Sequence, residues 1–181
     1  QCPPPVLPGA LTGSTVLGAF CMCTVQIPLL SAFSSISQAV LIAFLVLYVI
    51  TIMCNVYCLW ADPGQIHPNV TGDVAEGGLP ARAQKSWQYP HPVRRYDHYC
   101  KWVDNTIGLL NHREFVVMVG GLLVIAVLGM VVDIGLAILI AKKGLFISEI
   151  ILVMHGAYSL TLLAVVWPIF QIHCGLIARN E

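Results

Sequence analysis

The chain has 181 residues, of which 57% are hydrophobic and 10% are charged, and its mean hydropathy is +0.81. A typical soluble domain has about 25% charged residues, so this chain cannot cover a soluble surface with polar groups, and it is too apolar to be disordered. Its nine basic and nine acidic residues cancel, which argues against a nucleic-acid-binding surface. The first charged residue is Asp62, and charge is concentrated from there to Glu114. The composition therefore indicates an integral membrane protein with one polar insert.

Four apolar segments occupy most of the remaining chain. Crossing a bilayer core about 30 Å thick takes roughly 20 helical residues, and each segment is long enough. The expected helices lie at about 10–33, 36–60, 115–141 and 146–171. We therefore expect an all-α membrane protein, a bundle of four transmembrane helices, with helices 1 and 2 in residues 10–60, a cytosolic insert between helices 2 and 3 in residues 61–114, and helices 3 and 4 in residues 115–174.

The ends of the chain and the links between paired helices are short. Residues 1–9 are proline-rich and lack the basic start of a signal peptide, so we expect an N-terminal tail there. Residues 175–181 are expected to begin a cytosolic tail that the chain truncates. The links Ser31–Ser37 and Lys142–Gly144 predict tight turns within the two helical pairs.

The basic residues predict the topology. With four spans, the insert and both chain ends share one side of the membrane, and that side holds seven of the nine basic residues. Loops rich in Lys and Arg stay in the cytosol, so we expect the insert to be cytosolic. The two lysines of the 142–144 turn count against this assignment.

Polar side chains within the expected spans are few. Asp133 interrupts the third span, where a charge is costly, so we expect it to face the bundle interior and pair with Ser, Thr or His155. Four cysteines in the spans are expected to be packing residues: Cys21, Cys23, Cys54 and Cys58. We expect Cys100, the single cysteine of the insert, to be a free thiol because the cytosol is reducing.

The insert places a carboxylate, an imidazole and a thiol within four residues, at Asp97, His98 and Cys100. A cysteine attacks as the thiolate, which a neighbouring imidazole can generate and a carboxylate can support by orienting the ring. These residues are candidates for nucleophile, base and orienting group. Positive side chains nearby favour the thiolate and attract an anionic substrate: Arg94, Arg95 and Lys101. A chance motif in a polar loop is the alternative on these residues alone.

This stretch resembles the signature of the DHHC protein S-acyltransferases, the palmitoyltransferases, in its DHYC variant form. The resemblance extends along the chain to a DPG motif after the second span, to a Pro-x-Arg element at Pro80–Arg82, and to the residues that follow the cysteine. The matching motif positions are Asp62, Pro63 and Gly64, then Trp102, Asn105, Gly108 and Asn111, with Phe115 beyond them. Lys101 departs from the family, which has proline there.

The resemblance implies an enzyme that transfers a long-chain acyl group from palmitoyl-CoA to a protein cysteine through an S-acyl-enzyme. It implies acyl-CoA, membrane-associated protein substrates and the lipid bilayer as partners, and no cofactor besides the acyl-CoA substrate. We expect a multi-pass protein of the Golgi or ER membrane. Zinc-free DHYC members resemble the fungal type, including the ankyrin-repeat palmitoyltransferases, so an ankyrin region is expected before Gln1.

The family's insert usually holds two zinc ions, and here the usual ligand positions carry poor zinc ligands: Gly72, Ala75, Lys85, Ser86, Tyr89, Pro92, Tyr99 and Thr106. We therefore expect no bound metal. His67, His91 and His112 lack cysteine partners at zinc spacing, so we expect surface or capping roles for them.

Two alternatives remain open. The first is a weak or inactive family member that acts as a membrane scaffold, because zinc positions are lost and Lys101 is changed. The second is a small transporter subunit, which would place polar groups at mid-membrane on several spans. Only Asp133 and His155 meet that criterion.

Overall fold

The computed structural model describes residues 6–67, 79–141 and 143–178. It contains four helices long and apolar enough to cross a membrane: Val6–Ser31, Ser37–Trp60, His112–Ile140 and Phe146–Ala178. The expected all-α membrane fold with four spans is confirmed. The chain divides into two compact units, which we describe separately. The insert unit comprises Gln1–Thr12 and Met53–Val116, and the bundle unit comprises Gly13–Ile52 and Val117–Glu181.

The first span is not one continuous α-helix. It consists of α1 (Val6–Cys21), a π-helical turn η1 (Met22–Gln26) and α2 (Ile27–Ser31). Pro28 lies in the first turn of α2. Proline lacks an N–H and its ring crowds the preceding turn, so a locally widened helix here has a physical cause. Helix α1 begins at Val6, within the stretch expected to be a tail, and residues 1–5 lie outside the described residues.

The other three spans are single helices: α3 (Ser37–Trp60), α4 (His112–Ile140) and α5 (Phe146–Ala178). The link between α2 and α3 is as short as expected. Helix α5 continues to Ala178 rather than ending at residue 174, although it contains Pro168. The expected tail residues 179–181 and Lys142 lie outside the described part of the chain.

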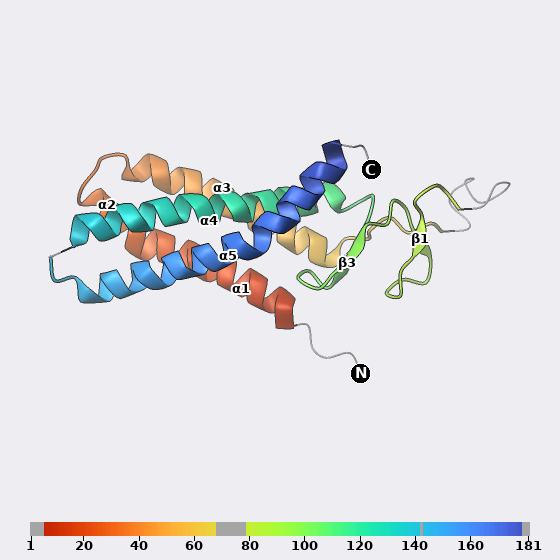
Figure 1. Cartoon of the computed structure of the whole chain (residues 1–181), viewed down its shortest axis with the longest axis horizontal. Helices are drawn as coiled ribbons and strands as arrows, with labels where there is room; N and C mark the ends of the chain where they lie inside the picture. Colours follow the sequence, from red (N-terminus) through yellow and green to blue (C-terminus); the bar gives the residue numbers. More distant parts are fainter. Residues whose placement is uncertain (1–5, 68–78, 142, 179–181) are drawn as a thin grey trace. The chain divides into compact units, whose positions relative to one another are not determined.

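The bundle unit packs its helices around two apolar clusters. In Figure 1 the parts of the first span, α3, α4 and α5 that belong to this unit run side by side. One cluster joins the first span, α3 and α4 through Met22, Ile27, Phe44, Tyr48 and Ile125. The other joins α4 and α5 through Leu136, Ile140 and Leu152, with Leu29 and Leu30 of α2 packed against it.

The insert unit contains two short antiparallel hairpins that the sequence does not predict. Strand β1 (Gln84–Lys85) pairs with β2 (Pro92–Val93), and β3 (His98–Cys100) pairs with β4 (Asn105–Ile107). Strands of two or three residues are too short to show an alternating hydrophobic pattern. Positive φ angles at Arg82, Arg95 and Asp104 mark bends around these strands.

Candidate active site

The β3–β4 hairpin carries the predicted nucleophile and base. His98 pairs with Ile107 and Cys100 pairs with Asn105. Because side chains alternate along a strand, His98 and Cys100 project from one face of the hairpin. Tyr99 projects from the other face, where its hydroxyl donates to Asp104 and its ring contacts Trp87 edge to face. The strand thus brings together the two groups that the chemistry requires.

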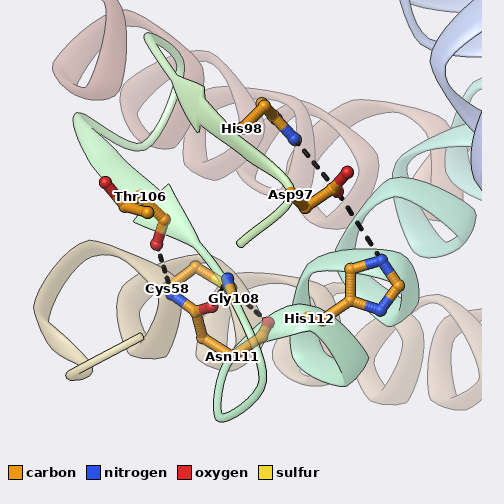
Figure 2. Close-up of polar contacts among 7 residues, drawn as sticks. All are labelled: Cys58, Asp97, His98, Thr106, Gly108, Asn111 and His112. Carbon is orange, nitrogen blue, oxygen red and sulfur yellow. Dashed lines mark hydrogen bonds and ion pairs between the residues drawn. The ribbon is translucent and has the colours of Figure 1, made fainter. Parts of the chain in front are cut away.

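The carboxylate of Asp97 lies against the imidazole of His98, with His98 Nδ1 3.1 Å from Asp97 Oδ2 (Figure 2). Burial alone would lower the pKa of His98, but its hydrogen bonds with Asp97 and Cys100 raise that pKa to about 9. At neutral pH the ring is therefore an imidazolium. Cys100 is buried, and its thiol is a hydrogen-bond partner of this ring. The three predicted residues are brought together as expected.

A second imidazole joins this cluster, and the sequence analysis missed it. His112 Nε2 lies 3.7 Å from Asp97 Oδ2, so Asp97 is flanked by two histidines (Figure 2). His112 is the first residue of α4, far from Asp97 in sequence. The expected surface or capping role of His112 therefore omits its contact with Asp97. That contact forms because the folded turn before α4 brings His112 to the carboxylate. No motif spacing could have indicated it.

Asn111 and Gly108 fix the turn between β4 and α4. Asn111 Nδ2 donates to Thr106 O at 2.9 Å, and Asn111 Oδ1 accepts from Gly108 N at 2.9 Å (Figure 2). A Cβ at Gly108 would lie 2.5 Å from Val93 and 2.6 Å from Pro63 O. Only glycine fits this close approach of backbone segments.

The sequence of this chain is similar to a known protein family. A protein-family model described as DHHC palmitoyltransferase matches residues 79–181, more than half of the chain. The chain belongs to the DHHC palmitoyltransferase family. It is a multi-pass membrane protein of that family, since it has four apolar helices of spanning length. Family membership does not favour the transporter alternative.

Two curated palmitoyltransferases show the extent of the similarity. Palmitoyltransferase AKR1 of Naumovozyma castellii is 29% identical over 138 residues, which cover 61% of this chain and 17% of that protein. Palmitoyltransferase ZDHHC12 of Homo sapiens is 41% identical over 51 residues, which cover 28% of this chain and 19% of that protein. The matched segments thus span under a fifth of the length of either relative.

The DPG motif of this DHHC chain forms the loop that follows α3. Asp62 Oδ1 accepts from Gly64 N at 2.7 Å and from Gln65 N at 2.8 Å. Burial alone would raise the pKa of Asp62, but these hydrogen bonds lower it below its ordinary value. Gly64 adopts a φ of 107°, and its carbonyl accepts from Arg94 N at 2.9 Å. The motif therefore fixes the segment that leads into β3.

Asn105 connects the same hairpin to the end of α3. Its Nδ2 donates to Cys58 O at 2.8 Å and to Ala61 O at 2.9 Å. The last carbonyls of a helix have no partner within the helix, so Asn105 satisfies two acceptors there. Its Oδ1 accepts from the hydroxyl of Tyr89 at 2.6 Å. This explains structurally why asparagine occupies this motif position.

The predicted headgroup-binding residues surround the hairpin with different exposure. Arg95 and Lys101 are exposed, whereas Arg94 is half-buried. Trp102, the remaining predicted motif residue, is half-buried in the turn between β3 and β4. The structure places all of these residues on or beside the segment that carries Cys100.

Several positions that hold zinc ligands in the resembled family are linked here by hydrogen bonds. Ser86 Oγ and Thr106 Oγ1 lie 2.7 Å apart in a buried pair, and Thr106 Oγ1 donates to Gln88 Oε1 at 2.9 Å. The hydroxyls of Tyr89 and Tyr99 donate to Asn105 and Asp104 in the same way. Hydroxyl groups at these positions do not suit zinc, which prefers thiolate, imidazole or carboxylate. Gly72 and Ala75 lie outside the described residues.

The bundle unit contains a separate polar cluster around Asp133. His155 Nδ1 lies 2.6 Å from Asp133 Oδ2, and Gln26 Nε2 donates to Asp133 Oδ1 at 3.1 Å. All three side chains are buried. The expected pairing of Asp133 with His155 inside the bundle is confirmed, and Gln26 is an additional partner that the π-helical turn presents.

Proposed function

We propose that this chain carries the active site of a protein S-acyltransferase that moves a long-chain acyl group from acyl-CoA to protein cysteines. The observation that carries the proposal is the thiol of Cys100 beside an imidazole that a carboxylate holds, on one short hairpin. This is the arrangement of an activated cysteine nucleophile. Palmitoyl-CoA is the proposed donor, as for the palmitoyltransferases that the chain resembles.

The reaction proceeds in two displacements at Cys100. In the first, the Cys100 thiolate attacks the thioester carbonyl of acyl-CoA, the carbon–sulfur bond to CoA breaks, and CoA leaves as its thiol with a proton from His98. In the second, His98 accepts the proton of an acceptor cysteine, whose thiolate attacks the acyl-enzyme and releases Cys100. Asp97 orients His98 and stabilises its positive charge throughout, as a positioning residue does in a triad.

The basic and apolar parts of the chain supply the two ends of the substrate site. Arg95 and Lys101 are exposed beside the nucleophile, and we assign them and Arg94 to the phosphates of CoA. The apolar helices provide an environment in which an acyl chain of about 16 carbons avoids water, at about 0.8 kcal/mol per buried methylene. Acceptor proteins are then those whose cysteines reach the membrane surface.

We propose that the insert folds without zinc. The buried Ser86–Thr106 pair and the tyrosine hydroxyls make contacts between segments that a metal would otherwise join. The purified protein should then keep its acyl-transfer rate and its thermal midpoint after treatment with 1,10-phenanthroline, with zinc below one equivalent by elemental analysis. Loss of activity that added zinc restores would contradict this proposal.

We further propose that the insert faces the cytosol in a Golgi or ER membrane. The basic residues of the insert support this side, because acyl-CoA is cytosolic and basic loops remain there. The test inserts a tag within residues 68–78 of the chain and treats sealed microsomes that contain the protein with protease. Protection of the tag from the protease would contradict the assignment.

The central test is Cys100→Ser in the full chain, with Cys174→Ser as the control, because Cys174 is an exposed cysteine outside the hairpin. An alkyne palmitoyl-CoA should label the parent and the control through a hydroxylamine-sensitive thioester, and should not label Cys100→Ser. Undiminished labelling of Cys100→Ser would remove Cys100 from the mechanism. Absence of labelling in the folded parent would favour the scaffold alternative.

A further inference from the structure

An aromatic pair lies on the face of the β3–β4 hairpin opposite Cys100. The ring centroids of Trp87 and Tyr99 are 5.0 Å apart with an interplanar angle of 70°, and Trp87 is 68% exposed. Rings packed edge to face leave ring faces free for another group. Asp104, which is also exposed, accepts a hydrogen bond from the hydroxyl of Tyr99. We call Trp87, Tyr99 and Asp104 the aromatic–acid site.

The backbone around Trp87 is fixed to the hairpin on both sides. Ser86 Oγ lies 2.7 Å from Thr106 Oγ1, and Gln88 Nε2 donates to Asp104 O at 3.0 Å. A rigid aromatic side chain on a fixed backbone loses little conformational entropy when a partner covers it. Trp and Tyr are also enriched among the residues that dominate binding energy at protein interfaces. The exposure of Trp87 is therefore suited to binding a protein partner.

The chemistry of the site favours a cationic group. Among the described contacts, Asp104 uses Oδ1 for Tyr99, and no described Lys or Arg forms an ion pair with it. A guanidinium group stacks on aromatic faces and pairs with a carboxylate through its planar fork, whereas an ammonium group offers only a point charge. The site therefore fits the side chain of an arginine.

We propose that the aromatic–acid site binds an arginine of the protein whose cysteine is acylated. This inference rests on the proposed acyltransferase function and concerns its second step, in which the acceptor cysteine attacks the acyl-enzyme. Tyr99 and Cys100 are consecutive residues with Cα atoms about 3.8 Å apart. A chain bound on one face of the hairpin therefore has only the width of a strand to pass before it reaches the nucleophile. Acceptors with an arginine near the cysteine react preferentially.

Binding is tested without any acyl transfer. The full chain is placed in nanodiscs, and fluorescence anisotropy measures its affinity for labelled peptides in which serine replaces the acceptor cysteine. One arginine is moved through the positions around that serine, and each peptide has a counterpart with citrulline, which keeps the shape of arginine without its charge. The best arginine peptide should bind about three- to tenfold more tightly than its counterpart. Equal affinities for arginine and citrulline peptides throughout the series would overturn the proposal.

Two variants assign this preference to the site. Asp104→Asn removes the charge, keeps an acceptor for the Tyr99 hydroxyl and tolerates the positive φ of 46° at this position. Trp87→Leu removes the stacking surface. Both should lose the preference for arginine over citrulline, whereas Glu149→Gln, which removes a carboxylate from α5, should retain it. An arginine preference that persists in Asp104→Asn or in Trp87→Leu would overturn the assigned site.

The effect on acyl transfer is measured with the acceptor cysteine restored in the best arginine peptide. The KM for this peptide should rise about three- to tenfold in Asp104→Asn and Trp87→Leu. The single-turnover rate of Cys100 acylation should stay within about twofold of the parent, because the site contacts the acceptor and not the acyl donor. An unchanged KM would overturn the proposed role in the second step. Failure of the parent to acylate Cys100 would instead contradict the proposed function, and the difference in peptide binding would be unaffected.

Discussion

Two of the Asp–His pairs among the described residues, Asp97–His98 and Asp133–His155, lie in very different surroundings. Asp97 and His98 lie 3.1 Å apart on a partly exposed hairpin, two residues from the thiol of Cys100. Asp133 and His155 lie 2.6 Å apart and are only 3% and 7% exposed within the bundle. The shorter and more deeply buried pair is Asp133–His155, and in the described contacts it has no adjacent nucleophile. Proximity of a carboxylate and an imidazole therefore does not identify the active site.

The partners of each carboxylate explain the difference. One oxygen of Asp97, Oδ2, lies close to the imidazoles of both His98 and His112. His98 also forms a hydrogen bond with Cys100. Asp133 uses one oxygen for His155 and the other for Gln26, so its hydrogen bonds tie separate spans together. On the proposed function, the first pair moves a proton at a reactive group, whereas the second satisfies a costly charge within the membrane.

The largest effect on chemistry is expected for Asp97→Asn. Replacing the carboxylate removes the charge that stabilises the His98 imidazolium, so the rate of Cys100 acylation should fall about 10³-fold or more, as in triads that lose their carboxylate. Single-turnover labelling with alkyne palmitoyl-CoA measures the rate. A drop of less than about tenfold would show that Asp97 is dispensable.

The converse effect is expected for Asp133→Leu. Removing this carboxylate leaves His155 and Gln26 buried without their acceptor, which should destabilise the protein by about 3–5 kcal/mol. Unfolding in mixed micelles measures the stability, and acylation per folded molecule should stay within about twofold of the parent. The double variant Asp133→Leu, His155→Leu should recover part of the lost stability. Acylation lost in a fully folded Asp133→Leu protein would show that the two pairs are not functionally distinct.

The pH dependence should report the first pair. The pKa of His98 in the folded chain is about 9, above the ordinary value of about 6.5. The stabilisation that its charged form provides is therefore complete below about pH 6.5 and is lost as the pH rises through about 9. The rate of Cys100 acylation should fall over the same alkaline range, as a proton donor for the leaving thiol disappears. A rate that already falls between pH 6 and 7.5 would contradict the raised pKa.

The smallest effect is expected for Tyr99→His, which restores the more common family residue. Tyr99 lies on the face of the hairpin opposite His98 and Cys100, so acylation should change by less than about threefold. Loss of the hydrogen bond to Asp104 should cost about 1 kcal/mol. Thermal unfolding measures this cost, with Tyr99→Phe as the matched variant that removes only the hydroxyl.

Much of this organisation is predictable from the sequence, and the reasons for the exceptions are physical. Hydropathy over twenty residues reports the spans because lipid imposes that length. The residues of the triad lie within one short stretch, so a motif can show them. Strands of two or three residues leave no period to read, and His112 reaches Asp97 only through the turn that Asn111 closes. Gln26 was missed because a π-helical turn breaks the regular helical register.

That turn has a consequence for sequence insertions and deletions in the first span. A π-helical turn accommodates an extra residue within an otherwise α-helical segment. Deleting one residue between Met22 and Gln26 would restore an ordinary helix and leave the residues before the turn facing their present neighbours, so Gly18 would still face Tyr48 and Tyr158. Deleting a residue from the regular helix between Gly18 and the turn would instead rotate its two halves by about 100° relative to each other. Either Gln26 would then turn away from Asp133, or Gly18 would no longer face the two tyrosines.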